Sequence, residues 1–283
     1  MRVVSKQILS LVGPIILSAL SLLLSFLFIQ PLAIFLHPTF NLLSSRGIGK
    51  ITFTFIVIFQ LLLLISLLPK KFLDKLLKIN IFFFKEKDFL RKFFGYFIIF
   101  FILHSSILFF IFLSGFAKYN PEWGNFTVKL ILRTFFGFIA TFFLAWTEEL
   151  IFRGTIFQYF TRKLTNFTSL IITSFIFMFA HNLKNPLDLI TKNWKLGLGL
   201  FLLGMLLNLI FIDTQKLYTG MGAHAGIVFV KVILRRAPFL LFLPQTYLPF
   251  WINKDLRMAP LVHILFIITI IIFVIKNHKK MFK

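Results

Sequence analysis

Long apolar segments separated by short basic ones place the strongest constraint on how this chain can fold. Of its 283 residues, 59% are hydrophobic, and a soluble domain of this size could not bury so much apolar surface. One helix crosses a hydrocarbon core with about 20 apolar residues. The sequence therefore predicts an all-α, polytopic membrane bundle of about eight helices in a single domain, 1–283. The predicted spans are 8–35, 51–69, 93–116, 128–150, 167–182, 196–212, 218–234 and 260–275.

The net charge of +22 lies mainly in the segments between these spans. This distribution is typical of membrane topology signals and of contacts with lipid headgroups, and it argues against a nucleic-acid partner. The connector 70–92 alone carries eight Lys and Arg residues. Because positive loops stay in the cytoplasm, we expect a multi-pass protein of the cell membrane with both termini cytoplasmic. The absence of cysteine excludes disulfides, thiolate metal sites and cysteine nucleophiles.

Two adjacent carboxylates interrupt the predicted span 128–150, in the stretch AWTEELIFRG. Glu148 and Glu149 are the only two of the nine acidic residues that fall within a predicted span. Glu149 and Arg153 are four residues apart and can pair on one helix face, whereas Glu148 points about 100° away. One interpretation is a charge pair with a spare interfacial carboxylate. The other is a structural brace, Glu149–Arg153, beside a reactive Glu148, since ionisable groups inside membranes are usually functional.

A histidine in the next span lies at the depth of these carboxylates. His181 ends the stretch FMFAH, and a turn is predicted at 162–166. Glu148 precedes that turn by about 15 residues and His181 follows it by about the same number. Equal distances from the turn of an antiparallel hairpin give equal depth, here about 22 Å. We therefore expect His181 to be a partner of Glu148.

A second histidine, His224, stands in the stretch GMGAHAGIVF between Gly222 and Gly226. Small residues at this spacing allow close approach of helices, so this segment should be buried against protein. His224 is about 8 residues, or about 12 Å, past the turn at 213–216. It reaches the depth of Glu148 if the helix that carries Glu148 projects about 10 Å beyond the membrane, toward Tyr159.

A carboxylate with two histidines supports two kinds of water chemistry. Glu148, His181 and His224 could bind Zn²⁺ or another divalent metal with an open water position. Alternatively, they could activate water without a metal, with Glu148 as general base. Either form attacks a carbonyl group. Asn208 shares a face with Gly204 and should point inward, where it either bonds a neighbouring helix or supports the site.

In this order the motifs resemble those of the CPBP family of intramembrane proteases, also called the CAAX protease and bacteriocin-processing or Abi family, which includes the type II CAAX prenyl endopeptidases. The family's Glu-Glu pair with a following Arg matches Glu148, Glu149 and Arg153. Its Phe-xxx-His motif matches Phe177 and His181.

The third family motif, His-xxx-Asn, is met only at its first position, because Val228 follows His224 where the family has Asn. The resemblance covers 128–234, which would be the catalytic core helices. It implies that the first Glu and the two His surround the catalytic water and that the Arg braces the second Glu. It also implies an oxyanion donor at the Asn position, and Asn208 is a candidate substitute for it.

The resemblance predicts an intramembrane endopeptidase that cleaves a membrane-anchored protein or peptide, with prenylated substrates as one class. Val228 favours a different reading, a non-proteolytic scaffold or bacteriocin-immunity protein with a degenerate site. A proton-coupled transporter using Glu148 is a third, although the sequence has no internal repeat of the kind common in transporters.

Overall fold

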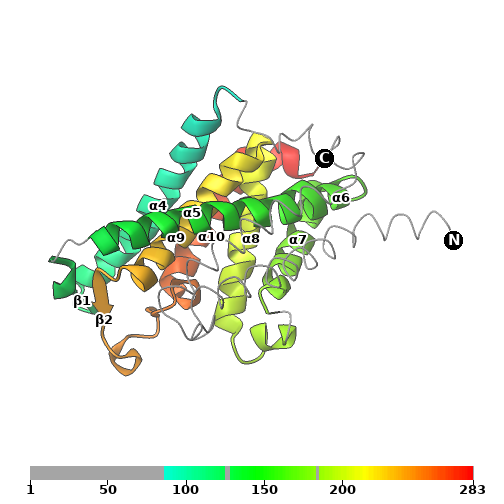
Figure 1. The fold of residues 1–283 in the computed structure, drawn as a ribbon. Helices are drawn as coiled ribbons and strands as arrows, with labels where there is room; N and C mark the ends of the chain where they lie inside the picture. Colours follow the sequence, from blue (N-terminus) through cyan, green and yellow to red (C-terminus); the bar gives the residue numbers. More distant parts are fainter. Residues whose placement is uncertain (1–85, 125–127, 183–184, 283) are drawn as a thin grey trace, which may run out of the picture.

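The computed structural model describes residues 86–282 apart from 125–127 and 183–184 (Figure 1). The predicted spans 8–35 and 51–69 lie outside the described residues. Within the described part the chain is mostly helical. The long helices are α4 (Phe89–Leu113), α5 (Val128–Ile151), α7 (Asn166–Ala180), α8 (Trp194–Thr214), α9 (Leu217–Arg236) and α10 (Pro260–Met281).

Shorter elements connect them. A π-helix (Phe152–Phe157) and α6 (Gln158–Thr161) continue α5. Two three-residue strands, β1 (Ala117–Tyr119) and β2 (Leu240–Phe242), lie in the loops after α4 and α9. Four 3₁₀ turns complete the described part: Pro121–Gly124, Pro186–Leu189, Gln245–Tyr247 and Leu256–Met258.

Five helices in the described part are long and apolar enough to cross a membrane: Phe89–Leu113, Leu130–Thr161, Trp194–Thr214, Leu217–Arg235 and Pro260–Met281. Together with the shorter α7, they correspond to the last six predicted spans, with most ends within a few residues. The all-α membrane class is thereby confirmed. The total of eight spans stays a prediction, because two of them fall outside the described residues.

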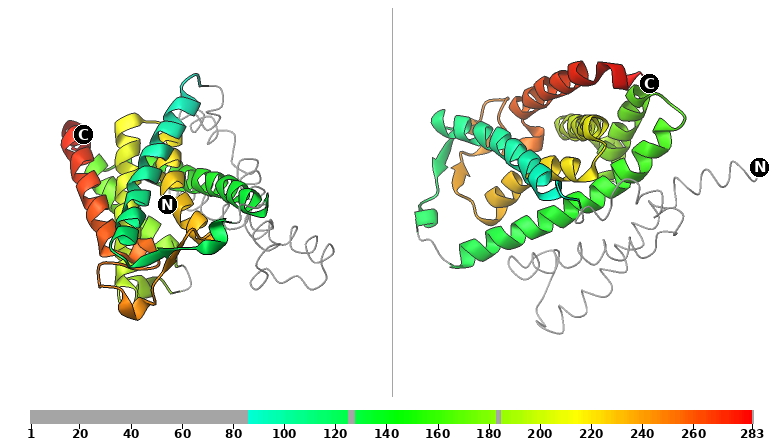
Figure 2. Two further views of the ribbon diagram at one scale, coloured as in Figure 1. Left: turned by 90° about the vertical axis from the view of Figure 1, so that its left-hand side faces the viewer. Right: turned by 90° about the horizontal axis from the view of Figure 1, so that it is seen from above.

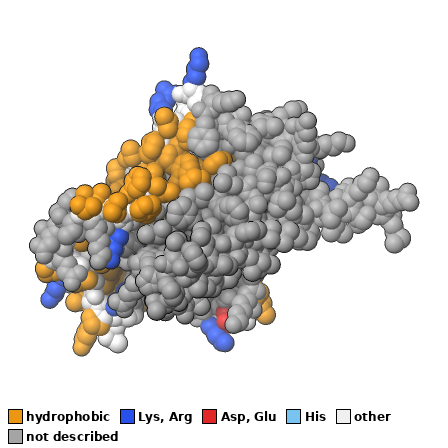
Figure 3. Space-filling view, viewed as in Figure 1, with side chains coloured by type: hydrophobic (Ala, Val, Ile, Leu, Met, Phe, Trp, Pro, Cys, Tyr) orange, Lys and Arg blue, Asp and Glu red, His pale blue; other side chains and the backbone are white. Residues whose placement is uncertain are grey.

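The helices form a core pair with outer helices around it (Figure 2). In the most apolar stretches of α8 and α9, 72% of residues are buried, against 28–33% for α4, α10 and the helix that starts with α5. The outer helices therefore carry the surface that faces lipid. Figure 3 shows hydrophobic side chains covering α4, with Lys and Arg side chains beyond its two ends.

Glycines bring α9 against α4. A Cβ atom on Gly222 would collide with the backbone oxygen of Phe93, and one on Gly226 would collide with that of Phe97. Only a residue without a side chain permits this approach, as the small-residue spacing predicted. The other sides of α9, one of which carries His224, pack against α5 and α8.

A short two-stranded antiparallel sheet closes one end of the bundle. β1 pairs with β2 in the register Ala117↔Phe242 and Tyr119↔Leu240. The side-chain amide of Asn120 donates to the oxygen of Pro238 at 2.7 Å. These bonds tie the loop after α4 to the loop after α9, and so hold the C-terminal end of α9 in place.

Candidate functional site

The carboxylates lie where α5 changes its winding. Glu148 and Glu149 occupy the last turn of α5, and the π-helix Phe152–Phe157 follows directly. The Thr155 hydroxyl donates to the oxygen of Leu150, five residues earlier, at 3.1 Å. π-Helical turns occur frequently at functional sites, where they alter the direction in which side chains project. The helix continues to Thr161, as expected for a helix that runs past Glu149 toward Tyr159.

Arg153 holds Glu149 in a fully buried network. Its Nη1 donates to Glu149 Oε1, its Nε to Asn208 Oδ1 and its Nη2 to the Gly204 backbone oxygen, each at 3.0 Å. Neither side chain of the ion pair is more than 1% exposed. Because a buried guanidinium is costly unless its donors are paired, these three acceptors together make the buried charge tolerable. Glu149 and Arg153 thus form a buried ion pair, as their spacing of four residues predicted.

Asn208 links this brace to α7. Its Nδ2 donates to the Leu170 oxygen at 3.3 Å and to Ser174 Oγ at 3.2 Å, while its Oδ1 accepts from Arg153. It therefore bonds a neighbouring helix and supports the site at once. Since Asn208 is fully buried and its amide nitrogen faces Leu170 and Ser174 on α7, the geometry does not support Asn208 as a donor to a substrate oxyanion.

The structure brings Glu148 together with both histidines. Glu148 Oε2 lies 3.8 Å from His181 Nε2 and 3.7 Å from His224 Nε2. The His224 side chain is 3% exposed, whereas those of Glu148 and His181 are 19% and 23% exposed. The cluster is therefore closed on the α9 side and accessible on the side of Glu148 and His181.

Hydrogen bonds fix the direction of each imidazole. His181 Nδ1 lies 2.8 Å from the backbone oxygen of Phe177, and because that oxygen can only accept, Nδ1 carries the proton. His224 Nδ1 lies 3.2 Å from Glu149 Oε1, the oxygen that also accepts a hydrogen bond from Arg153 Nη1. In the neutral rings both Nε2 atoms are therefore unprotonated.

Three acceptors consequently face one point. His181 Nε2 and His224 Nε2 lie 3.8 and 3.7 Å from Glu148 Oε2, a buried oxygen with no hydrogen-bond partner among the described residues. Acceptors cannot satisfy one another, and a buried unpaired acceptor is costly. The space between these three acceptor atoms therefore suits a molecule or ion that donates protons or carries positive charge.

The Phe177 ring packs against His181, His224 and Arg153. Its ring centroid is 4.6 Å from that of His181 and 6.1 Å from that of His224, and the Arg153 guanidinium carbon lies 4.9 Å from its centre. The side chain is completely buried. The cation–π contact and the ring contacts explain why an aromatic residue stands one turn before His181.

Sequence reasoning missed two close approaches. A Cβ atom on Gly220 would lie 2.7 Å from Glu149 Oε2, and one on Gly204 would lie 3.1 Å from the Ser174 Cα. Gly220 makes room for the Glu149 carboxylate, and Gly204 lets α8 approach α7. Gly220 is two residues before Gly222 in the same glycine-rich stretch, but nothing local indicates that its neighbour is a carboxylate from another helix.

The same three residues are the donors that a metal would use. Two histidines and a carboxylate suit zinc, and each histidine has its other nitrogen held by an oxygen, as metal-binding imidazoles usually do. No group of three or more His, Cys, Asp or Glu residues in the described part is arranged to hold a metal ion. The chemistry of the donor set thus fits zinc, while the separations of 3.7 and 3.8 Å are wider than in a closed metal site.

Residues 129–230 match a family model described as type II CAAX prenyl endopeptidase Rce1-like. The matched range includes the carboxylates, the brace and both histidines. It supports a CAAX-type intramembrane endopeptidase in general. No curated protein and no solved structure shows significant similarity to the chain.

Proposed function

Because residues 129–230 belong to the CAAX prenyl protease (CPBP) family, we propose that this chain is an intramembrane endopeptidase in which Glu148 activates a water molecule held with His181 and His224. One observation carries the proposal. A buried carboxylate oxygen that has no hydrogen bond with any described residue lies within 3.8 Å of two imidazole nitrogens. A water molecule would supply the protons that this arrangement lacks.

The proposed reaction is hydrolysis of an amide. The bound water donates one hydrogen to Glu148 and the other to an Nε2 atom, which directs an oxygen lone pair away from the cluster toward the substrate. As that oxygen bonds to the carbonyl carbon, Glu148 takes the first proton. The same proton then passes to the leaving nitrogen as the carbon–nitrogen bond breaks, which yields a carboxylic acid and an amine.

The buried half of the site keeps this arrangement in place. His224 receives its orientation from Glu149, and Glu149 receives its own from Arg153. His181 receives its orientation from the Phe177 carbonyl. Preorganised groups of this kind lower the barrier because they need not reorganise during the reaction.

A divalent cation held by Glu148, His181 and His224 would instead supply a polarised water with a lowered proton affinity. Metal analysis of purified, active protein distinguishes the two forms. About one zinc per chain, with activity lost on chelation and restored by zinc, would establish the metal form. Zinc far below one per active chain would establish the metal-free form.

The substrate that we propose is a peptide segment of a membrane-anchored protein. Glu148 and His224 lie in membrane-spanning helices, His181 directly follows the shorter α7, and the accessible side of the site is formed by Glu148 and His181. The family description adds prenylated C-terminal peptides as one class. A pair of reporter peptides that differ only in the prenyl group would show whether the lipid contributes to recognition.

Comparative proteomics of membrane fractions is the test of the proposed activity. We expect a precursor to accumulate with Glu148→Ala or His181→Ala, but not with the wild type. His104→Ala is the matched control, because His104 is also buried in a membrane helix but packs against Phe266, with ring centroids 5.3 Å apart. Processing that is unchanged in both site variants would exclude the proposed base and its partner.

Val228 and the complete burial of Asn208 favour one competing function, a scaffold or bacteriocin-immunity protein that keeps the helices without the chemistry. A deletion phenotype distinguishes the two. Rescue by a protein with alanine at Glu148, His181 and His224 would support the scaffold. Rescue by the wild type alone would support the protease.

A further inference from the structure

Two segments with exposed apolar side chains lie at one end of the bundle, and we call them the end segments. The shorter one, 185–193, leads into α8, and the longer one, 237–259, joins α9 to α10. All three helices are long and apolar enough to cross a membrane, so the end segments lie where hydrocarbon gives way to headgroups. Figure 1 shows both of them at the lower end of the molecule.

Two glycines of α8 bring the end segments against the start of that helix. A Cβ atom on Gly197 would collide with the backbone oxygen of Leu189, and one on Gly199 would collide with that of Arg257. Because one segment touches each glycine, both segments pack against the first turns of the same helix. They therefore lie on the same side of the membrane.

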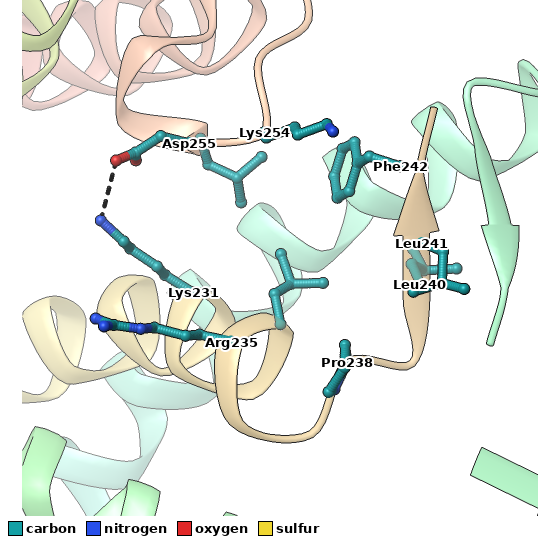
Figure 4. A pocket seen from close by; sticks show the side chains of 10 residues that line it. Lys231, Arg235, Pro238, Leu240, Leu241, Phe242, Lys254 and Asp255 are labelled. Carbon is teal, nitrogen blue, oxygen red and sulfur yellow. Dashed lines mark hydrogen bonds and ion pairs between the residues drawn. The ribbon is translucent and has the colours of Figure 1, made fainter. Parts of the chain in front are cut away.

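The longer end segment is fastened along its inner side. Lys231 Nζ on α9 donates to Asp255 Oδ2 at 3.1 Å (Figure 4), and Arg257 Nη2 donates to the same oxygen at 2.7 Å. Burial alone would raise the pKa of Asp255, but the bonds and charges of Arg257 and Lys231 lower it to about 2, so Asp255 remains ionised. The inner apolar side chains are buried: Leu248, Ile252 and Leu256. The outer side chains are therefore held facing outward.

The outer sides of the end segments expose large apolar and aromatic side chains. These side chains are 47–78% exposed: Leu187, Ile190, Leu241, Tyr247 and Phe250. Figure 3 shows hydrophobic side chains at the lower left, where the longer end segment lies in Figure 1. Lys192 and Lys254 stand among them and are also exposed. Aromatic residues and lysines at the ends of spanning helices are typical of the boundary with lipid headgroups.

This apolar surface continues onto the helices that face lipid. The Trp251 ring contacts that of Phe110 on α4, with centroids 5.9 Å apart, and Phe110 is 49% exposed. The backbone oxygen of Trp251 accepts from the Leu261 amide, in the first turn of α10, at 3.3 Å. Trp194, which directly follows the shorter end segment, is 53% exposed. Since lipid contacts these helices, lipid is also the occupant that fits the adjoining end segments.

We propose that the two end segments enter the bilayer and bind the lipid surface, with Ile190, Tyr247 and Phe250 below the headgroup phosphates. Apolar side chains of an interfacial segment reach about 5–10 Å into the boundary between headgroups and acyl chains. Lys192 and Lys254 then lie beside the phosphates. The inference rests on the membrane-spanning character of α8, α9 and α10 and is independent of the proposed proteolysis.

The test uses spin labels on single cysteines, because the chain contains no cysteine of its own. Ile190→Cys and Phe250→Cys each carry one label, in full-length protein reconstituted in vesicles of phosphatidylcholine and phosphatidylglycerol. We expect both labels to collide more often with oxygen, which dissolves in hydrocarbon, than with a water-soluble nickel chelate. The ratio of the two collision rates should correspond to a depth of about 5–10 Å below the phosphates.

Two other exposed positions are the matched references. Ile268→Cys, on α10, reports hydrocarbon, and Arg162→Cys, in the basic connection before α7, reports water. Depths between these references for both end segments support the proposal. Collision with the nickel chelate at the rate found for position 162, in either end segment, would overturn it, because that segment would then stand in water. Labels shielded from both reagents would also overturn it, since a second copy or another protein would then cover the segments.

Discussion

Replacing Asn208 with leucine tests the buried network that holds the brace. Asn208 is fully buried, and its Oδ1 is the acceptor for Arg153 Nε at 3.0 Å. Leucine has a similar volume, so the substitution leaves little cavity but removes this acceptor. A hydrogen bond to a charged group contributes about 1.5–3 kcal/mol. Losing the hydrogen bonds from Asn208 Nδ2 to α7 costs little stability, because the Leu170 oxygen still accepts from the Ser174 hydroxyl at 2.6 Å. We therefore expect a destabilisation of about 2–3 kcal/mol.

Asn277 provides the matched control. It is 2% exposed, but within the described residues its Nδ2 donates only to the backbone oxygen of Phe273, at 3.0 Å, and no charged group there bonds to it. Asn277→Leu should cost about 1 kcal/mol, the usual contribution of a neutral hydrogen bond. Unfolding of both variants in mixed micelles, followed by circular dichroism against denaturant, measures the difference. Equal midpoints would refute the argument that Asn208 matters chiefly through the buried charge of Arg153.

Two further predictions follow from local geometry. Gly220→Ala should lower both the stability of the fold and the activity of the site, because the added Cβ would lie 2.7 Å from Glu149 Oε2. Gly95→Ala is the control: its added Cβ meets no described atom within 4 Å, so the substitution should be neutral or stabilising by up to about 1 kcal/mol. A thermal shift of the same sign and size for both would contradict this. The lowered pKa of Asp255, about 2, means that its ion pairs stabilise the fold above pH about 4 and lose that effect as the pH falls toward 2. The stability difference between wild type and Asp255→Asn should therefore shrink over that range, and a constant difference would exclude the effect.

The helices were predictable because each apolar run is much longer than the uncertainty in where it begins and ends. The largest error in a helix boundary occurs where a helix continues into charged residues. The last span was expected to end at 275, but α10 continues to Met281, because Lys276 and Lys280 bond to Asp213 at the end of α8. A hydropathy pattern does not show that Asp213 on another helix pairs with these lysines. The two short strands were also missed, since three residues are too few to show an alternation.

The site was predictable in part. The spacing of four between Glu149 and Arg153 sufficed to predict their pairing, and equal distances from a turn sufficed to place Glu148 and His181 at one depth. Which nitrogen faces Glu148, and which residues satisfy Arg153, depend on contacts between helices distant in sequence. Gly204 and Asn208 therefore could not be given their roles from the sequence alone, although Asn208 was expected to face inward.

The central claim is that Glu148 is the base for one water held with His181 and His224. The direct measurement is the rate at which purified Glu148→Gln protein in proteoliposomes cleaves the precursor that accumulates in cells with the inactive variant. Glutamine keeps the shape of the side chain and cannot take the proton, so the account predicts a loss of at least about 100-fold with an unchanged unfolding midpoint. Cleavage within about threefold of the wild-type rate would contradict it.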